Sequence, residues 1–338
     1  MWPPGSGRTC CCGWRCSRGV PGEAERVRVL NGFLGLKNAP RACVATIGNF
    51  DGVHLGHQRI LEKVRERARA LRIDALAVAF DPHPLKILRP DKAPRTILTR
   101  QQKVEILAAQ GMDLLLFIPF SHETAQVEAE RFVEEFLIGT LGVRELYVGV
   151  DFRFGKDRKG DLALLRQAAS ERRFVVESLE TVSRGGERVS ASRIRAALER
   201  GDVREARAMM GRPYEAIGEV VRGAGRGRAQ GAPTANLAVA NEVIPASGVY
   251  LTETRLEERL FPSLTNIGTR PTFENAGFAV ETWLPDFTGD LYGRRLRVLF
   301  HERIRDEMKF ASPEALRQQI DRDLQSMRDY FARSPGNP

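Results

Sequence analysis

The chain contains 338 residues, of which 42% are hydrophobic and 28% are charged, a composition typical of ordinary globular proteins. This length predicts two domains, and this composition excludes a wholly disordered chain. The formal net charge is +9, but the basic residues are interspersed with acidic ones and the chain has no lysine-rich tail. We therefore predict no nucleic-acid partner. The longest apolar runs, such as residues 114–120, are shorter than the roughly 18 residues of a membrane span, and we predict no membrane partner.

The first 26 residues differ from the rest of the chain. They contain four of the five cysteines, whereas the fifth, Cys43, begins a predicted buried strand. No second cluster with metal-ligand spacing accompanies them, so a metal site is the weaker interpretation. The segment lacks the apolar core of a signal peptide, and we predict that residues 1–26 are a disordered extension or the product of an upstream start. A body without a disulfide framework predicts the cytoplasm.

Residues 27–205 are predicted to form the first domain, because short apolar runs there alternate with helical patterns. The apolar runs are CVATIGNF, ALAVAF, DLLLFIPF, ELYVGV and FVVESL. Helical patterns begin at His57, at Thr99, near Glu128 and after Asp161. This alternation predicts a nucleotide-binding α/β domain with a parallel sheet covered by helices. Ligands bind at the carboxyl ends of such strands, where we expect the loops GNFDGVHLGH, FDPHP and GVDFRFGKDRKG.

The stretch GNFDGVHLGH has the features of a phosphate site at a helix amino terminus. The unpaired N–H groups and the partial positive charge of such a terminus attract anions. Gly48, Gly52 and Gly56 allow a polyphosphate to approach the backbone closely. His54 and His57 add donors that can follow negative charge as it moves onto a departing pyrophosphate. The stretch therefore predicts transfer at the α-phosphate of a nucleoside triphosphate.

Two less specific interpretations of these histidines exist. An isolated His-x-x-His is more often a structural turn followed by a helix cap. A Zn²⁺ site is the other alternative, although no third ligand stands nearby in the sequence. The motifs that accompany the stretch favour the nucleotide site over both.

Residues 206–333 are predicted to form the second domain. The stretch SASRIRAALERGDVREARAMMGRPY predicts a serine-capped helix and a second short helix, ended by Gly211 and Pro213. Beyond it, β-branched stretches separated by Gly and Pro predict a small antiparallel barrel or sandwich. These stretches are AIGEVV, ANLAV, GVYLTETRL, SLTNIG, FAVETWL and RRLRVLFHERI. A last helix is predicted from Pro313 to about Ala332.

The second domain contains a candidate phosphate cradle, although the chain has no Gly-x4-Gly-Lys-Ser/Thr loop. The stretch GAGRGRAQGAPTANL is glycine-rich and basic, and it includes Gly225 and Gly227. Thr234 and Asn236 at its end lie on one face of an extended segment, so a hydroxyl and an amide oxygen can share Mg²⁺ with ATP. Glu281, on a later strand, is suited to deprotonate an attacking alcohol. Without further context the stretch is more often a turn, and Glu281 more often a solvated strand residue.

From Val27 to about Phe331 the chain resembles bacterial bifunctional riboflavin kinase/FAD synthetases. GNFDGVHLGH is similar to the His-x-Gly-His signature of the nucleotidyltransferase superfamily, and FDPHP, GVDFRFGKDRKGD and VSASRIR are similar to the family's adenylyltransferase half. GRPY, GAPTANL, SGVY, TNIGTRPTF, VET and GDLYGRRLRVLFHERIRDEMKF follow in the order of its riboflavin kinase half. The resemblance implies a Rossmann-like nucleotidyltransferase domain followed by a small six-stranded antiparallel β-barrel with the C-terminal helix.

The resemblance implies that the first domain transfers the adenylyl group of ATP to FMN, so that FAD forms and pyrophosphate leaves. The implied catalytic residues are His54 and His57. The residues expected to bind nucleotide or phosphate are Gly48, Asn49, Asp51, Gly56, Ser190, Ser192 and Arg193. The residues expected to bind flavin are Asp151, Phe152 and Phe154.

The resemblance implies that the second domain phosphorylates riboflavin with ATP to give FMN. Glu281 corresponds to the catalytic base, and Thr234 and Asn236 correspond to ligands of Mg²⁺. Gly225 and Gly227 are expected near the phosphates, and Arg305 is expected near the flavin. The implied partners are the small molecules riboflavin, FMN and ATP, and no protein partner is predicted.

The chain departs from the family pattern at two positions. Trp283 stands where the family usually shows histidine, and Ala191 stands where it usually shows serine or a similar residue. Neither residue is the implied base or a metal ligand, so the departures bear on substrate affinity or rate.

Two other functions share parts of this pattern. A class I aminoacyl-tRNA synthetase relative shares the His-x-Gly-His logic, but the chain has no Lys-Met-Ser-Lys-Ser signature. A flavin- or nucleotide-binding regulator would keep both pockets without turnover. Substitution of Glu281 or His57 distinguishes the regulator from an enzyme, because only an enzyme has an activity to lose.

Overall fold

The structure of the protein is a computed structural model. It describes residues 27–222, 234–269 and 278–333. The predicted extension at residues 1–26 lies outside the described residues, as do Gly225 and Gly227 of the predicted phosphate cradle.

Contacts along the chain divide it into two compact units. One is Glu25–Ile194, and the other contains Arg195–Pro338. The domain limits predicted from the sequence, 27–205 and 206–333, stay a prediction. No helix in the described part of the chain is long and apolar enough to cross a membrane.

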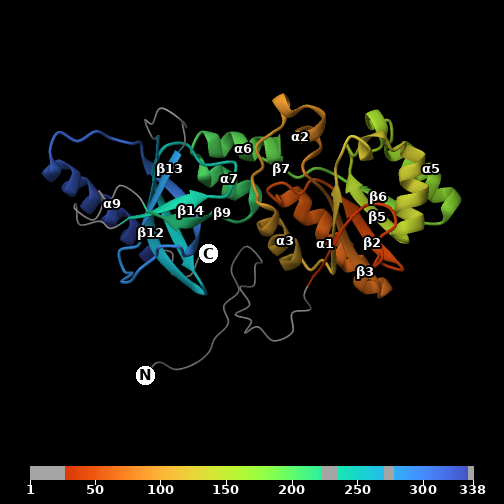
Figure 1. Ribbon diagram of the computed structural model, residues 1–338, viewed down its shortest axis with the longest axis horizontal. Helices are drawn as coiled ribbons and strands as arrows, with labels where there is room; N and C mark the ends of the chain where they lie inside the picture. Colours follow the sequence, from red (N-terminus) through yellow and green to blue (C-terminus); the bar gives the residue numbers. More distant parts are fainter. Residues whose placement is uncertain (1–26, 223–233, 270–277, 334–338) are drawn as a thin grey trace, which may run out of the picture. The chain divides into compact units, whose positions relative to one another are not determined.

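The first unit contains a six-stranded parallel sheet, which confirms the predicted α/β architecture (Figure 1). The strands are β1 Arg28–Asn31, β2 Cys43–Ile47, β3 Asp74–Asp81, β4 Leu114–Pro119, β5 Val143–Gly149 and β6 Val175–Leu179. They lie in the order β1-β4-β3-β2-β5-β6, and every pair is parallel. The interior strands β2, β3 and β4 are almost wholly buried, which explains their continuous apolar runs. Strand β1 was not predicted, because its sequence RVLN contains no apolar run.

Helices follow the strands in the predicted alternation. They are α1 Leu55–Leu71, α2 Pro84–Leu88, η1 Pro90–Lys92, α3 Arg100–Ala109, η2 Thr124–Gln126, α4 Ala129–Arg131, η3 Phe132–Thr140, η4 Lys156–Arg158 and α5 Leu162–Arg172. Helix α3 begins after Thr99, whose side chain forms a capping box with Gln102. The helix predicted near Glu128 is α4 continued by the π-helical segment η3, whose wider turns the sequence pattern does not reveal. A short hairpin, β7 Ser183–Arg184 and β8 Glu187–Arg188, closes the series.

The order of the strands explains where a ligand can bind. Strands β3 and β4 are added on one side of β2, whereas β5 and β6 are added on the other. The carboxyl end of β2 therefore lies at the point where the strand order reverses, which is the usual ligand site of such sheets. The stretch GNFDGVHLGH begins at this point.

An ion pair between Arg67 and Glu145 connects α1 with strand β5 of the sheet. Arg67 Nη2 lies 2.5 Å from Glu145 Oε1 on β5, and Arg67 Nε donates to Oε2 at 2.8 Å. The hydroxyl of Tyr147 also donates to Glu145 Oε2, at 2.8 Å. The hydrogen bond from Arg67 holds the pKa of the Glu145 carboxyl below its usual value of 4.5.

We expect Glu145→Gln to lower the free energy of unfolding at neutral pH and to flatten its dependence on acid pH. Because the pKa of Glu145 is lower in the folded protein than in the unfolded chain, the ionised carboxylate stabilises the fold above pH 4.5. That contribution is lost as the pH falls through the lowered folded pKa. Urea denaturation should therefore show the wild type and the variant converging below pH 4.5, whereas the exposed control Glu62→Gln should stay within about 0.5 kcal/mol of the wild type throughout. A difference that stays constant down to about pH 3 would contradict this expectation.

The second unit contains a closed antiparallel barrel. Of the two architectures predicted for this domain, a barrel and a sandwich, the barrel is confirmed. Its strands are β9 Tyr214–Val221, β10 Thr234–Val239, β11 Gly248–Leu256, β12 Arg259–Thr269, β13 Phe278–Trp283 and β14 Arg295–Arg305, in the order β10-β13-β12-β11-β14-β9. The helices α6 Ala191–Glu199 and α7 Val203–Met210 precede the barrel, and Gly211 ends α7 in a left-handed conformation as predicted. The last helix, α9, spans Pro313–Arg333 and confirms the predicted C-terminal helix.

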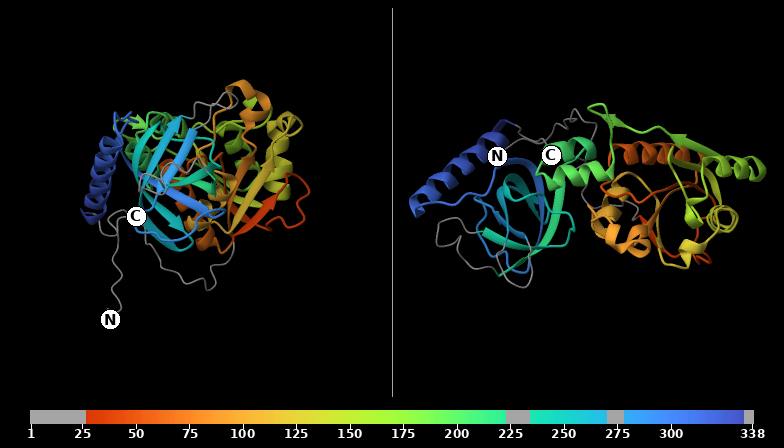
Figure 2. Two further views of the ribbon diagram at one scale, coloured as in Figure 1. Left: turned by 60° about the vertical axis from the view of Figure 1, so that its left-hand side comes forward. Right: turned by 90° about the horizontal axis from the view of Figure 1, so that it is seen from above.

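Helix α9 packs on the outside of the barrel, where Figure 2 shows it in dark blue. Met327 of α9 is 2% exposed and contacts Val249, Leu251 and Leu264 of the strands β11 and β12. Trp283 of β13 also packs against this cluster. The amphipathic pattern of the last helix is thus explained by its contact with the barrel wall.

Five buried hydroxyl side chains form a hydrogen-bonded cluster within the barrel. They are Thr252, Thr254, Ser263, Thr265 and Thr282, and each is 0% exposed. The oxygen–oxygen distances in the cluster range from 2.8 to 3.4 Å. The contact between Thr254 of β11 and Thr282 of β13 joins strands that are not neighbours in the sheet, so this hydroxyl cluster fills the interior. Its members satisfy one another, as buried polar groups must.

Candidate functional site

The turn between β2 and α1 contains the first group of predicted residues. The N–H of Gly48 donates to the carbonyl oxygen of Val78 on β3, which continues the sheet by one residue. The backbone then adopts left-handed conformations at Phe50, Gly52 and Val53, with φ of 47°, 75° and 39°. Such conformations cost energy in residues that carry a Cβ, and they cluster at ligand sites. The strain at this turn is therefore consistent with a functional loop.

Gly52 and Gly56 are required at their positions for different reasons. At Gly52 the φ of 75° already disfavours other residues, and a Cβ would lie 3.2 Å from Ile97 Cδ1. Gly56 has ordinary helical geometry, but a Cβ there would lie 3.2 Å from the ring of His54. A side chain at Gly56 would therefore press on the ring of His54.

The two predicted histidines lie together at the amino end of α1. His54 Nδ1 accepts a hydrogen bond from the N–H of His57 at 3.3 Å, so His54 is also the helix cap that the alternative interpretation predicts. The two imidazole rings stack with centroids 3.7 Å apart and planes at 15°. The ring of Phe50 meets His57 edge-on at 5.2 Å. The helix terminus and two imidazoles thus converge on one place, where an anion is favoured.

Asn49 and Asp51 connect this turn to neighbouring loops. Asn49 Nδ2 lies 3.1 Å from His83 Nε2 in the FDPHP loop. The carboxylate of Asp51 is 4% exposed and accepts the N–H groups of Ile97 at 2.9 Å and Leu98 at 3.3 Å. Asp51 therefore ties the turn to the segment that leads into α3. Its role in nucleotide binding stays a prediction.

Two residues of this site were missed by sequence reasoning. His83 follows β3, and its Nδ1 accepts the N–H of Leu85 while its Nε2 faces Asn49. Lys103 of α3 donates from Nζ to the carbonyl oxygen of Asn49 at 2.8 Å. The FDPHP loop was expected near the site, so the sequence could have indicated its histidine as a site residue. It gave no such indication for Lys103, because that residue lies within a helical pattern far along the chain.

We expect Asp51→Ala to lower the free energy of unfolding by about 1–3 kcal/mol, because two buried N–H groups lose their acceptor. Asp51→Asn should recover part of this loss, since an amide oxygen can still accept. The exposed control Asp91→Ala should change the free energy of unfolding by less than about 0.5 kcal/mol. Urea denaturation measures all three variants. Equal effects at positions 51 and 91 would show that the observed hydrogen bonds add no stability.

The residues that begin α6 form the second predicted group of phosphate contacts. Ser190 Oγ accepts the N–H of Arg193 at 3.3 Å, so Ser190 caps the helix as predicted. Arg193 Nη1 donates to three backbone carbonyls of the β7–β8 hairpin at 3.0 to 3.3 Å, and its Nε lies 3.2 Å from the carboxylate of Glu187. Ser192 is exposed in the first turn. The hairpin thus holds the guanidinium in place, and the phosphate contacts stay a prediction.

The three residues predicted to bind flavin follow β5 and have different environments. Asp151 is exposed and pairs with Arg188 at 2.8 Å. Phe154 is 6% exposed, and its ring lies 5.4 Å from that of Phe132 in the hydrophobic core. Phe152 is only partly buried and stacks on Phe154 with centroids 5.6 Å apart. Phe154 is therefore a core residue that supports Phe152, the ring with surface left for a ligand.

In the second unit, three neighbouring strands bring polar side chains into one row. Glu281 of β13 is the cross-strand partner of Asn236 on β10 and of Asn266 on β12. Cross-strand partners share a face of a sheet, so Glu281 lies between the two asparagines. Within the described part of the chain these three side chains make no hydrogen bond to another residue. Asn266 was missed by sequence reasoning, although it belongs to the stretch TNIG.

The oxygen donors of β10 fit a magnesium ion. Thr234 is the partner of Trp283 in the same ladder, two residues before Asn236 and on the same face. A hydroxyl and an amide oxygen suit Mg²⁺, which usually keeps water and substrate phosphates as its other ligands. Among residues 27–222, 234–269 and 278–333, no group of three or more His, Cys, Asp or Glu is arranged to hold a metal ion. The Mg²⁺ interpretation therefore depends on Thr234, Asn236 and the phosphates of ATP.

Arg305, predicted near the flavin, holds α9 against the barrel. Its Nη2 donates to Asp323 Oδ2 at 2.7 Å, and its Nε donates to both carboxylate oxygens at 3.0 and 3.1 Å. Gln319 donates to the same carboxylate at 2.8 Å. The guanidinium thus has a structural partner, and its contact with flavin stays a prediction.

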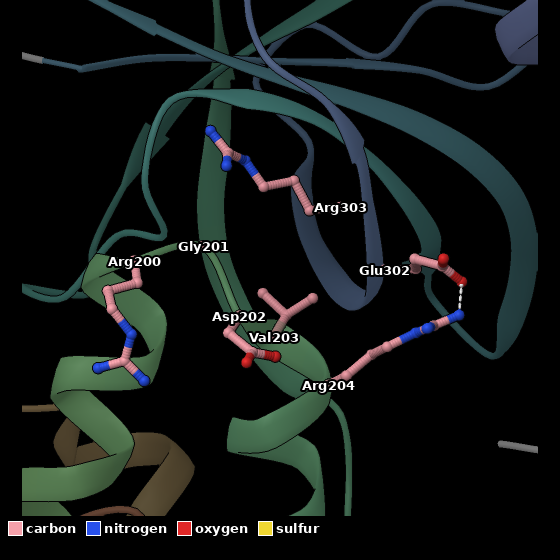
Figure 3. A pocket seen from close by; sticks show the side chains of 7 residues that line it. All are labelled: Arg200, Gly201, Asp202, Val203, Arg204, Glu302 and Arg303. Atoms are coloured by element: carbon pink, nitrogen blue, oxygen red, sulfur yellow. Dashed lines mark hydrogen bonds and ion pairs between the residues drawn. The ribbon is translucent and has the colours of Figure 1, made fainter.

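A pocket of about 250 Å³ lies beside the start of α7, and none of the residues that line it is a predicted site residue (Figure 3). It is lined by Arg200, Gly201, Asp202, Val203, Arg204, Glu302 and Arg303. Its arginines have carboxylate partners: Arg204 pairs with Glu302, Arg200 with Glu205 at 2.9 Å, and Arg303 with Asp306 at 2.6 Å. We assign no substrate to this pocket.

Two family models match the chain. The model described as FAD synthetase matches residues 36–193, and the model described as riboflavin kinase matches residues 210–331. The first match includes the turn between β2 and α1 and ends at Arg193. The second includes all six strands of the barrel and most of α9.

Curated relatives match the chain over nearly their whole length. The bifunctional riboflavin kinase/FMN adenylyltransferase of Pseudomonas fluorescens is 41% identical over 310 residues, which cover 91% of this chain and 99% of the relative. The protein of the same name from Escherichia coli strain K12 is 38% identical over 307 residues, which cover 90% and 98%. Among solved structures, one described as a macrolide-efflux protein from Streptococcus pneumoniae superimposes with a TM-score of 0.81 at 27% identity, covering 89% of this chain and 98% of that one.

Proposed function

The chain belongs to the family of bifunctional riboflavin kinases/FMN adenylyltransferases, and from that premise we propose which residues carry each reaction. The riboflavin kinase half transfers the γ-phosphate of ATP to riboflavin and gives FMN and ADP. The adenylyltransferase half transfers the adenylyl group of a second ATP to FMN and gives FAD and pyrophosphate. The adenylyltransferase half comes first along the chain, and the kinase half follows it.

For adenylyl transfer, the stacked pair of His54 and His57 at the start of α1 carries the proposal. A phosphate oxygen of FMN attacks the α-phosphorus of ATP in line with the departing pyrophosphate, so no covalent enzyme intermediate is needed. Negative charge grows on the departing group as the bond breaks. Imidazole N–H groups and the helix terminus stabilise that charge, while Gly48, Gly52 and Gly56 leave room for the phosphates.

For phosphoryl transfer, the row of Asn236, Glu281 and Asn266 carries the proposal. Glu281 accepts the proton of the riboflavin hydroxyl as the oxygen attacks the γ-phosphate. Asn236 and Asn266 flank the carboxylate on the neighbouring strands. Mg²⁺ bound by Thr234 and Asn236 would neutralise the charge of the ATP phosphates.

The remaining predicted residues are proposed as supporting contacts. Ser190, Ser192 and Arg193 contact phosphates from the start of α6, and Asn49 and Asp51 shape the nucleotide turn. Asp151 and Phe152 meet the flavin in the first half, with Phe154 beneath them in the core. Arg305 lies near the flavin in the second half.

We further propose that the protein works in the cytoplasm with riboflavin, FMN and ATP as its partners, and without a nucleic-acid, membrane or obligatory protein partner. In the described part of the chain Cys43 is a free and fully buried cysteine. Burial raises the pKa of its thiol, which keeps it in the unreactive protonated form. A reduced cysteine of this kind is typical of a cytoplasmic protein.

A time course with riboflavin, ATP and Mg²⁺ tests the whole proposal. Chromatography should show FMN appearing first and FAD following it, and chelation of Mg²⁺ should stop both steps. FMN without FAD would remove the catalytic role of the histidine pair. No conversion of riboflavin and none of added FMN would reject the enzyme and support the binding-only regulator.

A further inference from the structure

Lys103 of α3 reaches the nucleotide turn from a distant part of the sequence. Its Nζ donates to the carbonyl oxygen of Asn49 at 2.8 Å, 54 residues away along the chain. The side chain of Asn49 in turn lies 3.1 Å from His83 Nε2. The ammonium group therefore holds the backbone carbonyl of Asn49, the residue whose side chain contacts the FDPHP loop.

The segment that contains Lys103 holds the turn at several further points. The N–H groups of Ile97 and Leu98 bind the buried carboxylate of Asp51. Ile97 also lies against Gly52, where a Cβ would be 3.2 Å from its Cδ1. Residues 97–103 thus form a clamp on the turn, through the N–H groups of Ile97 and Leu98 and the ammonium of Lys103.

The turn needs such a clamp because its own conformation is strained. Phe50 follows Asn49 directly and has a φ of 47°, which costs a non-glycine residue of order 1–3 kcal/mol. The ring of Phe50 contacts His57, so a change at Phe50 moves the histidine pair. A hydrogen bond to the carbonyl of Asn49 opposes relaxation of the peptide that joins the two residues.

The position of the ammonium is costly, which argues against an incidental contact. Burial lowers the pKa of Lys103, and the positive charges of Arg100 and Lys86 act in the same direction. The carboxylates of Asp51 and Asp81 oppose that effect. A charged group in such a place requires compensating contacts, and the carbonyl of Asn49 is one of them.

Resting on the proposed adenylyltransferase function, we propose that Lys103 is a positioning residue of that site, which holds the β2–α1 turn in the conformation that aligns His54 and His57 with the departing pyrophosphate. It acts through Asn49 and Phe50 and touches neither substrate. Small displacements of catalytic groups reduce the rate of the chemical step, because correct alignment of the reacting groups lowers the activation barrier.

Lys103→Met tests the inference, because methionine keeps the apolar stem and removes the donor. We expect the single-turnover rate of FAD formation from FMN and ATP to fall by about tenfold to a hundredfold, the effect of a lost charged hydrogen bond. The KM for ATP should stay within about threefold and the riboflavin kinase rate of the same preparation should be unchanged. Lys103→Arg should restore most of the rate, since a guanidinium can donate to the same carbonyl. Lys37→Met, which removes an exposed lysine of the same unit, is the matched control.

A merely structural role would lower the melting temperature or the amplitude of FAD formation but leave the single-turnover rate constant intact, which would overturn the inference. An unchanged rate in Lys103→Met would also overturn it, as would an arginine variant as slow as the methionine variant. If the wild type itself formed no FAD from FMN, the proposed function would fail, and this outcome is distinct from failure of the Lys103 inference alone.

Discussion

Replacing Glu281 with glutamine should reduce the kcat of riboflavin phosphorylation by about 10²- to 10⁴-fold, the usual contribution of a general base. Glutamine keeps the size of the side chain and its place between Asn236 and Asn266, but it cannot accept the proton of the attacking hydroxyl. Adenylylation of supplied FMN should be unchanged, because that reaction uses the other half of the chain. Chromatography of FMN and FAD from one preparation measures both rates.

Glu258→Gln is the matched control, because Glu258 is exposed between strands β11 and β12 of the same barrel. It should leave both activities within about twofold of the wild type, as expected for surface changes. A Glu281→Gln variant with normal kinase activity would exclude Glu281 as the base. Loss of both activities would indicate a folding defect instead of a catalytic one.

Replacing His57 with alanine should have the opposite selectivity. We expect FAD formation from FMN to fall by about 10²- to 10³-fold, the effect of removing one donor from a site where negative charge develops. Riboflavin phosphorylation should continue at the wild-type rate. Pyrophosphate release with FMN as substrate, compared with ADP release with riboflavin, measures the two reactions separately.

Two further variants sharpen this result. His122→Ala removes an exposed histidine of the same unit and should leave both rates unchanged. His54→Asn separates two roles of His54, because asparagine is a good helix cap but lacks the imidazole. If the asparagine variant kept full adenylylation, capping would be the whole role of His54 and the histidine pair would lose one of its two catalytic members.

The sequence predicted those parts of the fold that depend on local patterns. Alternating apolar runs and helical patterns predicted the parallel sheet, because buried strands such as β3 contain a continuous apolar run. The same logic missed β1, whose four residues RVLN pair with β4 at the edge and are mostly exposed. The barrel could be separated from a sandwich only through the resemblance, because closure requires β9 to pair both with β10, the next strand in sequence, and with β14, which lies far along the chain.

The candidate site shows the same division. His54 and His57 were predicted because they lie three residues apart in one distinctive stretch, and the structure stacks them. Lys103 and His83 were missed as individual residues, because Lys103 reaches the turn from helix α3 and His83 reaches it from the FDPHP loop, of which only the motif as a whole was expected near the site. Asp51 was predicted as a nucleotide contact, but its bonds to the N–H groups before α3 become visible only when the chain is folded.

The hydroxyl cluster inside the barrel constrains how this protein can change during evolution. Valine has nearly the shape of threonine, but a single Thr265→Val change would leave Thr252 and Thr282 with a lost partner in a buried place. Joint replacement of all the hydroxyls by apolar groups of equal size would be nearly neutral, because no polar group would then remain unsatisfied. Any path from one interior to the other by single substitutions passes through less stable intermediates. The cluster is therefore expected to be inherited as a block, kept or lost together among descendants of this chain.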